Sequence, residues 1–149
     1  NLAKSGNVNQ DLLQQLNGLD FYKASYPKSL GMEFVNAEIF PLIHSFLIDV
    51  KDKLRTFVEH IAIQIAKICD KPLAKLFITG GGAYNRFLIE RLRNYLPTTE
   101  VVIPDDKTIQ FKEALIFGFL GVLRLRNEIN VLSSVTGASK NHSSGVVFN

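Results

Sequence analysis

The 149-residue sequence contains one cysteine, one methionine and no tryptophan. Because Cys69 is alone, no disulfide can form within these residues, and this cysteine usage fits a reducing compartment. Long apolar runs are also absent, since the longest one extends from Ala114 to Leu123. A membrane-spanning helix needs roughly 20 apolar residues. The sequence therefore predicts neither a disulfide-stapled scaffold nor a membrane protein.

Basic residues outnumber acidic residues only slightly, by 17 to 14, which gives a net charge of +3. That excess is too small to indicate a nucleic-acid partner. Hydrophobic residues make up 46% of the chain and charged residues 21%, which is typical of one folded globular domain. The chain begins at Asn1 without a methionine, which indicates either processing or a piece of a longer protein.

Metal-ligand clusters are missing too. His44, His60 and His142 are far apart and have no metal-ligand spacing with Cys69, so no metal site is predicted. We interpret His60 as a surface residue on or beside the polar face of a helix, and Cys69 as a small buried side chain at a helix end.

Apolar residues at spacings of three and four predict helices over residues 9–16, 50–69, 85–96 and 111–125. Asn9 is a candidate cap of the first helix. Pro41 interrupts the segment that follows, and helix is expected to resume near His44. Short apolar runs predict two strands, at residues 76–78 and 101–103.

The helix predicted for residues 50–69 has an apolar stripe that includes Leu54 and Ile68, and a polar face that includes Glu59. In the next helix, three arginines form a basic surface that we interpret as solvated: Arg86, Arg91 and Arg93.

The helix predicted for residues 111–125 is apolar nearly all round, and Gly118 and Gly121 would let another backbone approach closely. We therefore expect it to be buried at the centre of the fold. Residues 133–149 are rich in serine and glycine, and form either an ordered loop or a frayed end.

Three consecutive glycines, Gly80 to Gly82, stand between the first predicted strand and the helix at residues 85–96. Glycine accepts positive φ angles and lets a ligand lie against the backbone. The helix that follows presents unpaired N–H groups and the positive end of its dipole, which suits a phosphate. A turn without a ligand is the alternative, but three glycines at this junction favour a bound nucleotide.

Two known nucleotide motifs fit this turn incompletely. A Walker loop is excluded because no Lys-Ser or Lys-Thr follows the glycines. A Rossmann fingerprint is matched in part. Gly80 and Gly82 fit, but Asn85 stands at the third position, while Asp105 and Asp106 follow the second strand as a ribose-binding acid would. A Rossmann-like cofactor-binding domain is the minor alternative.

The sequence resembles the C-terminal part of the anhydro-N-acetylmuramic acid kinases. Four segments carry this resemblance in order along essentially the whole chain: Pro27–Gly31 (P-K-S-L-G), Thr79–Asn85 (T-G-G-G-A-Y-N), Glu113–Phe117 (E-A-L-I-F) and Val135–Ala138 (V-T-G-A). Members of the wider sugar kinase and actin superfamily have two ribonuclease H-like domains with ATP in the cleft between them. The resemblance implies a helix-rich α/β fold, part of such an actin-like ATPase domain, with residues 1–149 as the C-terminal nucleotide-binding portion.

The resemblance also implies a reaction. The family opens the 1,6-anhydro ring of anhydro-N-acetylmuramic acid with water and phosphorylates the 6-oxygen from ATP and Mg²⁺. The product is N-acetylmuramic acid 6-phosphate, in the recycling of cell-wall sugars in the bacterial cytoplasm. A homodimer is the assembly that the family suggests, and neither nucleic acid nor membrane is an expected partner.

Site residues carry over only where a motif matches. Gly80, Gly81 and Gly82 are expected to line the ATP cleft, while Asn85 either caps the helix or contacts the nucleotide. Four further positions are candidates: Glu113 and Lys28 on the sugar side, and Thr136 and Gly137 in a loop near the site. For Glu113 a carboxylate that favours a helix N-terminus is an equal reading, and for Lys28 a solvated loop lysine is the alternative. Leu30 stands where the resemblance leads us to expect a small hydroxyl residue.

The family's first phosphate loop, G-T-S-x-D-G, and its general base, an aspartate, have no match in this sequence. Phosphoryl transfer depends on positioning and on charge stabilisation by metal and donors. We therefore predict that the N-terminal domain is absent from this chain and that the chain alone has no kinase activity. A non-catalytic nucleotide- or sugar-binding module is the second interpretation. Since only two strands are evident, we also expect an isolated chain to expose apolar surface and to associate.

Overall fold

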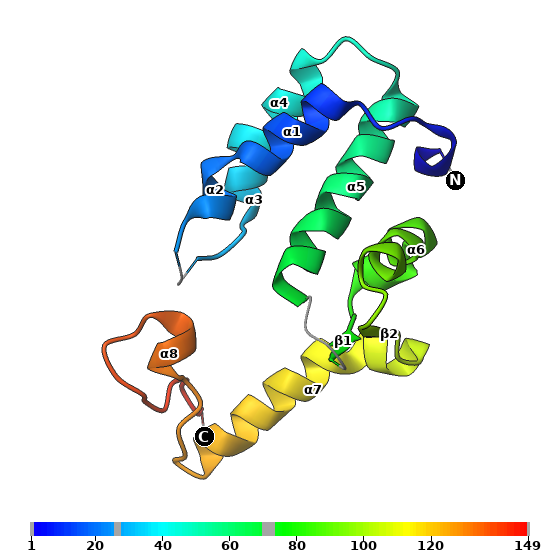
Figure 1. Cartoon of the computed structure of the whole chain (residues 1–149). Coiled ribbons are helices and arrows are strands. Elements are labelled where there is room, and N and C mark those ends of the chain that lie inside the picture. Colours follow the sequence, from blue (N-terminus) through cyan, green and yellow to red (C-terminus); the bar gives the residue numbers. More distant parts are fainter. Residues whose placement is uncertain (1, 26–27, 70–73, 149) are drawn as a thin grey trace. The chain divides into compact units, whose positions relative to one another are not determined.

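A computed structural model describes residues 2–25, 28–69 and 74–148 (Figure 1). The chain divides into two compact units, Asn1–Pro104 and Asp105–Asn149. Pro27, which belongs to the P-K-S-L-G segment, lies outside the described residues.

Helices make up most of the first unit. In chain order they are η1 (Ala3–Ser5), α1 (Gln10–Gly18), α2 (Asp20–Lys23), α3 (Met32–Phe34), η2 (Val35–Ile39), α4 (Phe40–Ser45), α5 (Val50–Cys69), η3 (Gly81–Tyr84) and α6 (Arg86–Tyr95). The predicted cap of the first helix is confirmed, because the Leu12 N–H donates to Asn9 Oδ1 at 2.9 Å. The long helix α5 has the bounds that its sequence pattern predicts.

The interruption predicted at Pro41 is wrong. Helices α3, η2 and α4 follow one another without a break from Met32 to Ser45. The middle piece, η2, is a π-helix in which the Phe40 N–H donates to the Val35 carbonyl. Pro41 stands in the first turn of α4, directly after the π-helix, and the helix continues through it although proline has no N–H to donate.

Helix α5 lies between α1 and α6 (Figure 1) and contributes to two apolar clusters. On the α1 side, Leu12, Leu16 and Ile39 are buried, and Phe57 of α5 packs against them. On the α6 side the buried members come from both helices: Val58, Ala62, Phe87, Leu88, Ile89 and Leu92. Because α5 has partners on two sides, it has no single buried apolar stripe. Leu54 and Ile68, which the sequence places on that stripe, are exposed.

His60 is not the surface residue that we expected, since its exposed fraction is 1%. Its Nδ1 lies 2.8 Å from Asn17 Oδ1 and its Nε2 lies 2.9 Å from the Tyr22 hydroxyl. Burial, and secondarily the charge of Lys67, lower the pKa of His60 to about 4. The ring is therefore neutral at pH 7 and joins α1 and α2 to α5 as a hydrogen-bonding group.

Two parallel strands complete the first unit, as the sequence predicts. Strand β1 (Lys75–Phe77) pairs with β2 (Glu100–Val102), with Leu76 opposite Val101. Helix α6 lies between them in the chain, so the segment is a β–α–β unit. Within the described ranges these are the two strands of the sheet.

The second unit consists of α7 (Asp106–Leu125), α8 (Ser133–Thr136) and the chain that follows. Helix α7 begins five residues before the predicted start at Phe111. Asp105 caps it by accepting a hydrogen bond from the Thr108 N–H at 2.9 Å, and this bond lowers the pKa of the Asp105 carboxyl. The 133–148 segment is held rather than frayed, because Val131 and His142 pair as an antiparallel bridge.

The buried, central position predicted for α7 is wrong for the described structure. Leu115 is 74% exposed and Phe117 is 71% exposed. At Gly118 and Gly121, apart from the backbone of α7 itself, no described atom of the second unit lies within 4 Å of where a Cβ would stand. The apolar surface of α7 is therefore not covered by its own unit. Among the described helices, none is long and apolar enough to cross a membrane.

Candidate functional site

The glycine turn joins β1 to α6, as the sequence predicts. The Ile78 N–H donates to the Val102 carbonyl at 3.0 Å and so extends the pairing of the two strands. Gly80 follows with φ 74°, a left-handed value that favours glycine. The 3-10 helix η3 and then α6 begin directly after it, so two helix starts follow one strand end.

Two backbone bonds close the turn. The Ala83 N–H donates to the Gly80 carbonyl at 3.0 Å, and the Asn85 N–H donates to the Gly82 carbonyl at 3.1 Å. The Ala83 side chain is buried beneath the turn. Two hydrogen bonds and a buried side chain therefore hold the turn in one conformation.

The outer side of the turn is open. At Gly80, Gly81 and Gly82, nothing described lies within 4 Å of the position that a Cβ would take. Gly81 and Gly82 are exposed and have no positive φ. Conformation requires glycine at Gly80 alone, so the other two glycines leave space that a ligand can use.

Asn85 caps α6. Its Oδ1 accepts a hydrogen bond from the Leu88 N–H at 3.1 Å. Of the two roles open to Asn85, capping is confirmed, and contact with a nucleotide stays a prediction. The cap fixes where α6 begins, so the positive end of the helix dipole lies next to the glycines.

A buried ionic contact holds α6 against α5. Glu59 is buried on α5 and receives hydrogen bonds from Arg91 Nε at 2.9 Å and Arg91 Nη2 at 2.8 Å. The Tyr95 hydroxyl also donates to Glu59 at 2.5 Å. Burial by itself raises the pKa of Glu59, but the bonds from Arg91 and Tyr95 outweigh burial and lower it. We call Glu59, Arg91 and Tyr95 the α5–α6 clasp.

The clasp corrects two predictions from the sequence. Glu59 was expected on the polar face of its helix and is buried, while Arg91 was expected in a solvated surface and is largely covered. Arg86 and Arg93 are exposed as predicted. No local pattern identifies the clasp, because its bonds join residues 32 positions apart.

A hollow of about 610 Å³ lies beside the turn, along one side of α6. Its described lining includes Tyr84, Arg86 and Arg93. The charge of Glu90, in the same hollow, is balanced by Lys4 at 2.6 Å. The hollow therefore combines an aromatic ring with two guanidinium groups next to the open glycines, which suits an anionic ligand with an aromatic part.

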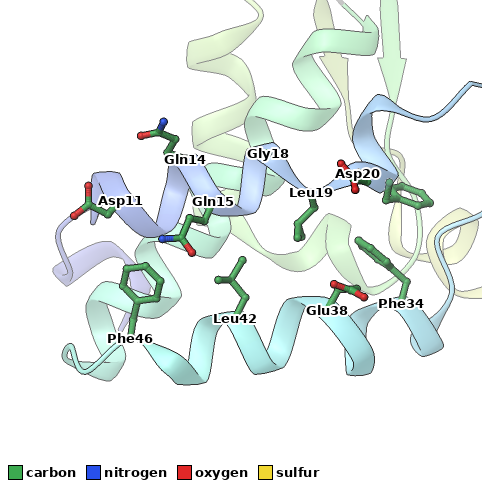
Figure 2. Close-up of a pocket in the computed structure, with 11 residues that line it drawn as sticks. Asp11, Gln14, Gln15, Gly18, Leu19, Asp20, Phe34, Glu38, Leu42 and Phe46 are labelled. Carbon is green, nitrogen blue, oxygen red and sulfur yellow. The ribbon is translucent and has the colours of Figure 1, made fainter.

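A hollow of about 1120 Å³ lies elsewhere, between α1 and the helices η2 and α4 (Figure 2). Figure 2 shows Gln15 and Leu19 pointing across it toward Leu42. Its described lining contains three carboxylates and no lysine or arginine: Asp11, Asp20 and Glu38. Such a lining repels a phosphate, so this hollow is not the place for a nucleotide.

The other predicted site residues belong to elements other than the turn. Lys28 belongs to the first unit and lines a separate hollow with the end of α5. Glu113 is exposed on α7 in the second unit, rather than at the helix N-terminus. Thr136 Oγ1 donates to the Leu132 carbonyl at 3.0 Å, and Gly137 ends α8 with φ 73°. Both residues therefore contribute to the local structure of α8.

A metal site needs several ligating side chains close together. Within residues 2–25, 28–69 and 74–148, no group of three or more histidine, cysteine, aspartate or glutamate side chains is arranged to hold a metal ion. The described part of the chain thus offers a cradle for a ligand at the glycines and no ligand set for a metal beside it.

These features define the class of protein as a helix-rich α/β domain with a small parallel sheet and an open glycine turn at a strand-to-helix junction. The model of the family "anhydro-N-acetylmuramic acid kinase" matches residues 1–149. The chain belongs to this family.

Individual relatives agree. The chain is 33% identical to the anhydro-N-acetylmuramic acid kinase of Aliivibrio fischeri, and the match covers 98% of this chain and 42% of that protein. It is 34% identical to the Vibrio cholerae kinase of the same name, over 98% of this chain and 41% of that protein. For the Hahella chejuensis kinase the identity is 33%, over 99% and 41%. The chain thus spans about two fifths of the length of the curated relatives that it matches.

Proposed function

We propose that this chain forms one wall of the ATP cleft of a kinase for anhydro-N-acetylmuramic acid. The complete enzyme opens the 1,6-anhydro ring with water and transfers a phosphoryl group from ATP to the 6-oxygen, in the recycling of cell-wall sugars in the cytoplasm. The observation that carries the proposal is the open turn Gly80–Gly82, where three glycines have free space above them. The family's name supplies the reaction and the acceptor.

Each residue has a proposed part. Gly80, Gly81 and Gly82 let the nucleotide lie against the backbone, and the capped start of α6 directs its positive dipole end at the phosphates. Asn85 fixes that start. On the sugar side we place Lys28 and Glu113, and a loop near the site contains Thr136 and Gly137.

In this proposal the chain contributes the binding and orientation of ATP. ATP, when bound, supplies the phosphoryl group, and Mg²⁺ is expected to neutralise its charge. The described residues offer no cluster for that metal, so we assign the Mg²⁺ ligands and the general base to the N-terminal domain of the complete enzyme. A homodimer of complete subunits is part of the same proposal.

The proposal predicts binding without turnover. The purified 149-residue chain is expected to bind ATP and to convert no detectable anhydro-N-acetylmuramic acid, because it has one wall of the cleft and no base. Detection of the 6-phosphate product by mass spectrometry from the chain alone would contradict this division of labour. If the purified chain binds ATP without turnover, it behaves as a non-catalytic nucleotide-binding module, which is the second interpretation of the isolated chain.

A variant of the turn tests the site directly. Gly81→Val places a branched side chain in open space at a position without a positive φ, so the fold tolerates it while the ligand loses its place. Calorimetric titration should show ATP affinity lower by at least about tenfold. Gly18→Ala, also in open space but at the end of α1, is the matched control and should bind normally. Normal ATP binding by folded Gly81→Val, or tight NAD binding without ATP binding, would overturn the assignment.

A further inference from the structure

Arg55 lies on α5 beside the α5–α6 clasp, and its side chain is 21% exposed. Its Nε is 3.7 Å from Glu59 Oε2, which is too far for a hydrogen bond, and it has no hydrogen-bond partner among the described residues. The same carboxylate oxygen already accepts a hydrogen bond from Arg91 Nε at 2.9 Å. Glu59 therefore attracts the Arg55 guanidinium by charge, but it does not fix the orientation of this group.

Helix α6 supplies the contact that orients Arg55. The guanidinium carbon lies over the Phe87 ring, 4.8 Å from its centre. A cation at this distance is attracted to the electron-rich face of an aromatic ring, most strongly where water is excluded. Phe87 is buried in the apolar cluster between α5 and α6, so the ring offers one fixed face. Arg55 thus joins the two helices through Phe87.

Phe87 connects this contact to the glycine turn. It is the second residue of α6 and belongs to the first turn of the helix. Asn85, two residues earlier, caps the helix through the Leu88 N–H. The 3-10 helix η3, which contains Gly81 and Gly82, ends directly before Asn85. A rotation of Phe87 would therefore move the cap and the glycines with it.

The clasp holds the opposite end of α6. Arg91 and Tyr95 belong to the second half of the helix, whereas Phe87 belongs to its first turn. A helix held near one end can pivot about that point, but a helix held near both ends keeps its direction. Leu88 and Ile89 are buried near the start, yet apolar burial is not directional. A directional contact near the start of α6 comes from Arg55.

We propose that Arg55 is a positioning residue of the nucleotide site. It holds Phe87, and through Phe87 the first turn of α6, in the orientation that directs the helix dipole at the phosphates. In this role Arg55 acts through the Phe87 ring and not by contact with the nucleotide. The inference rests on the proposed function, because it concerns the same turn and helix start.

A double-mutant cycle tests the route through Phe87. Arg55→Met keeps the apolar stem and removes the guanidinium, and Phe87→Leu keeps an apolar side chain and removes the ring. By calorimetric titration, each change should weaken ATP binding by about threefold to tenfold, and the double variant should lose no more than Phe87→Leu alone. Unchanged affinity in Arg55→Met would overturn the proposal. Losses that multiply in the double variant would overturn it too, because they would show that Arg55 acts by another route, such as long-range charge.

A second comparison separates positioning from a general loss of stability. Arg55→Lys keeps a cation over the ring and should recover most of the lost ATP affinity. Leu12→Ala weakens the other apolar cluster and should lower the melting temperature at least as much as Arg55→Met, with normal ATP affinity while the chain is folded. Absence of recovery in Arg55→Lys, or an equal loss of ATP affinity in Leu12→Ala, would refute positioning.

Backbone amide resonances of the isotope-labelled chain give a readout that needs no ligand. The signals of Gly81 and Gly82 should shift in Arg55→Met and stay in place in Leu12→Ala. Unmoved glycine signals in Arg55→Met would contradict the inference, whatever the chain binds. Shifted signals in a chain that does not bind ATP would support the role of Arg55 in holding the turn and would count against the proposed function alone.

Discussion

The two units of the chain use apolar residues in opposite ways. In the first unit, α5 has partners on two sides, and leucines such as Leu12, Leu16 and Leu92 are fully buried. In the second unit, the equally long α7 contains as many apolar residues as α5, yet Leu115 and Phe117 are mostly exposed. Apolar content therefore predicts a need for burial, and the presence of a partner decides whether burial occurs.

This contrast concerns stability and function together. In the first unit, α6 packs against α5 through buried apolar side chains. This packing holds the start of α6, and with it the glycine turn, in place. The second unit exposes several large apolar side chains of α7, Leu115 and Phe117 among them. The expectation that the isolated chain exposes apolar surface agrees with α7, and its tendency to associate stays a prediction.

The largest expected effect comes from a matched pair of leucines. Leu92→Ala in the first unit should lower the free energy of unfolding by about 2–5 kcal/mol, because it leaves a cavity in the cluster between α5 and α6. Leu115→Ala on α7 should change it by less than about 0.5 kcal/mol, because the side chain is exposed. Urea unfolding measures both. Equal losses would remove the contrast between the units.

The second prediction concerns pH and the buried His60. Its pKa is about 4 in the folded state and about 6.5 when unfolded, so the unfolded chain takes up the proton first as the pH falls. The contribution of the neutral His60 ring is complete above about pH 7.5 and is lost as the pH falls toward the folded pKa, so about 2 kcal/mol should be lost by about pH 5. His60→Gln should remove most of this dependence. His44→Gln alters an exposed histidine and should keep it, and the reverse pattern would refute the role of His60.

Breaking the α5–α6 clasp is the third prediction. Glu59→Gln removes the charge that pairs with Arg91 and leaves a largely covered guanidinium poorly satisfied, which should cost about 1–3 kcal/mol of unfolding free energy. Since the clasp holds α6, ATP affinity should fall as well. Arg93→Gln, on the same helix but exposed, is the control. A stable Glu59→Gln protein with unchanged ATP affinity would show that the clasp does not support the turn.

The smallest effect is expected in the second unit. Asp105→Ala removes the cap of α7 and should reduce the stability of this helix slightly, because the Thr108 N–H loses its partner. The loss should grow as the pH is raised in the acid range, because the lowered pKa of Asp105 makes its contribution present when the carboxyl is charged. Circular dichroism of helix content against pH measures it. Asp106→Ala, one residue on, is the comparison, and an equal loss there would argue against a specific cap.

Local features of the fold were predictable from the sequence. The bounds of α5, the caps Asn9 and Asn85, and the two strands around the glycines all depend on residues within a few positions of one another. The candidate site was predictable for the same reason, because a strand, a glycine turn and a helix start are consecutive in the chain. The start of α7 was missed because Asp105 and Asp106 were considered as acidic residues that follow a strand, and the cap that Asp105 provides was not predicted.

Burial of polar residues was not predictable. His60 and Glu59 lie at helical positions that a solvated residue would also occupy, and their partners are 43 and 32 residues away. The helical spacing of apolar residues predicts one buried face, whereas α5 packs against neighbours on two sides. The contact between Arg55 and the Phe87 ring likewise depends on α5 meeting α6.

The sequence by itself determined the family, the position of the glycine turn and the elements on either side of it, because these depend on short motifs and on hydrogen bonds between near neighbours. Only the tertiary structure decided that His60 and Glu59 are buried, that the space above Gly81 is open and that the second unit leaves apolar side chains of α7 exposed. Burial and open space are properties of distant segments that meet, and the pattern of any one segment does not contain them.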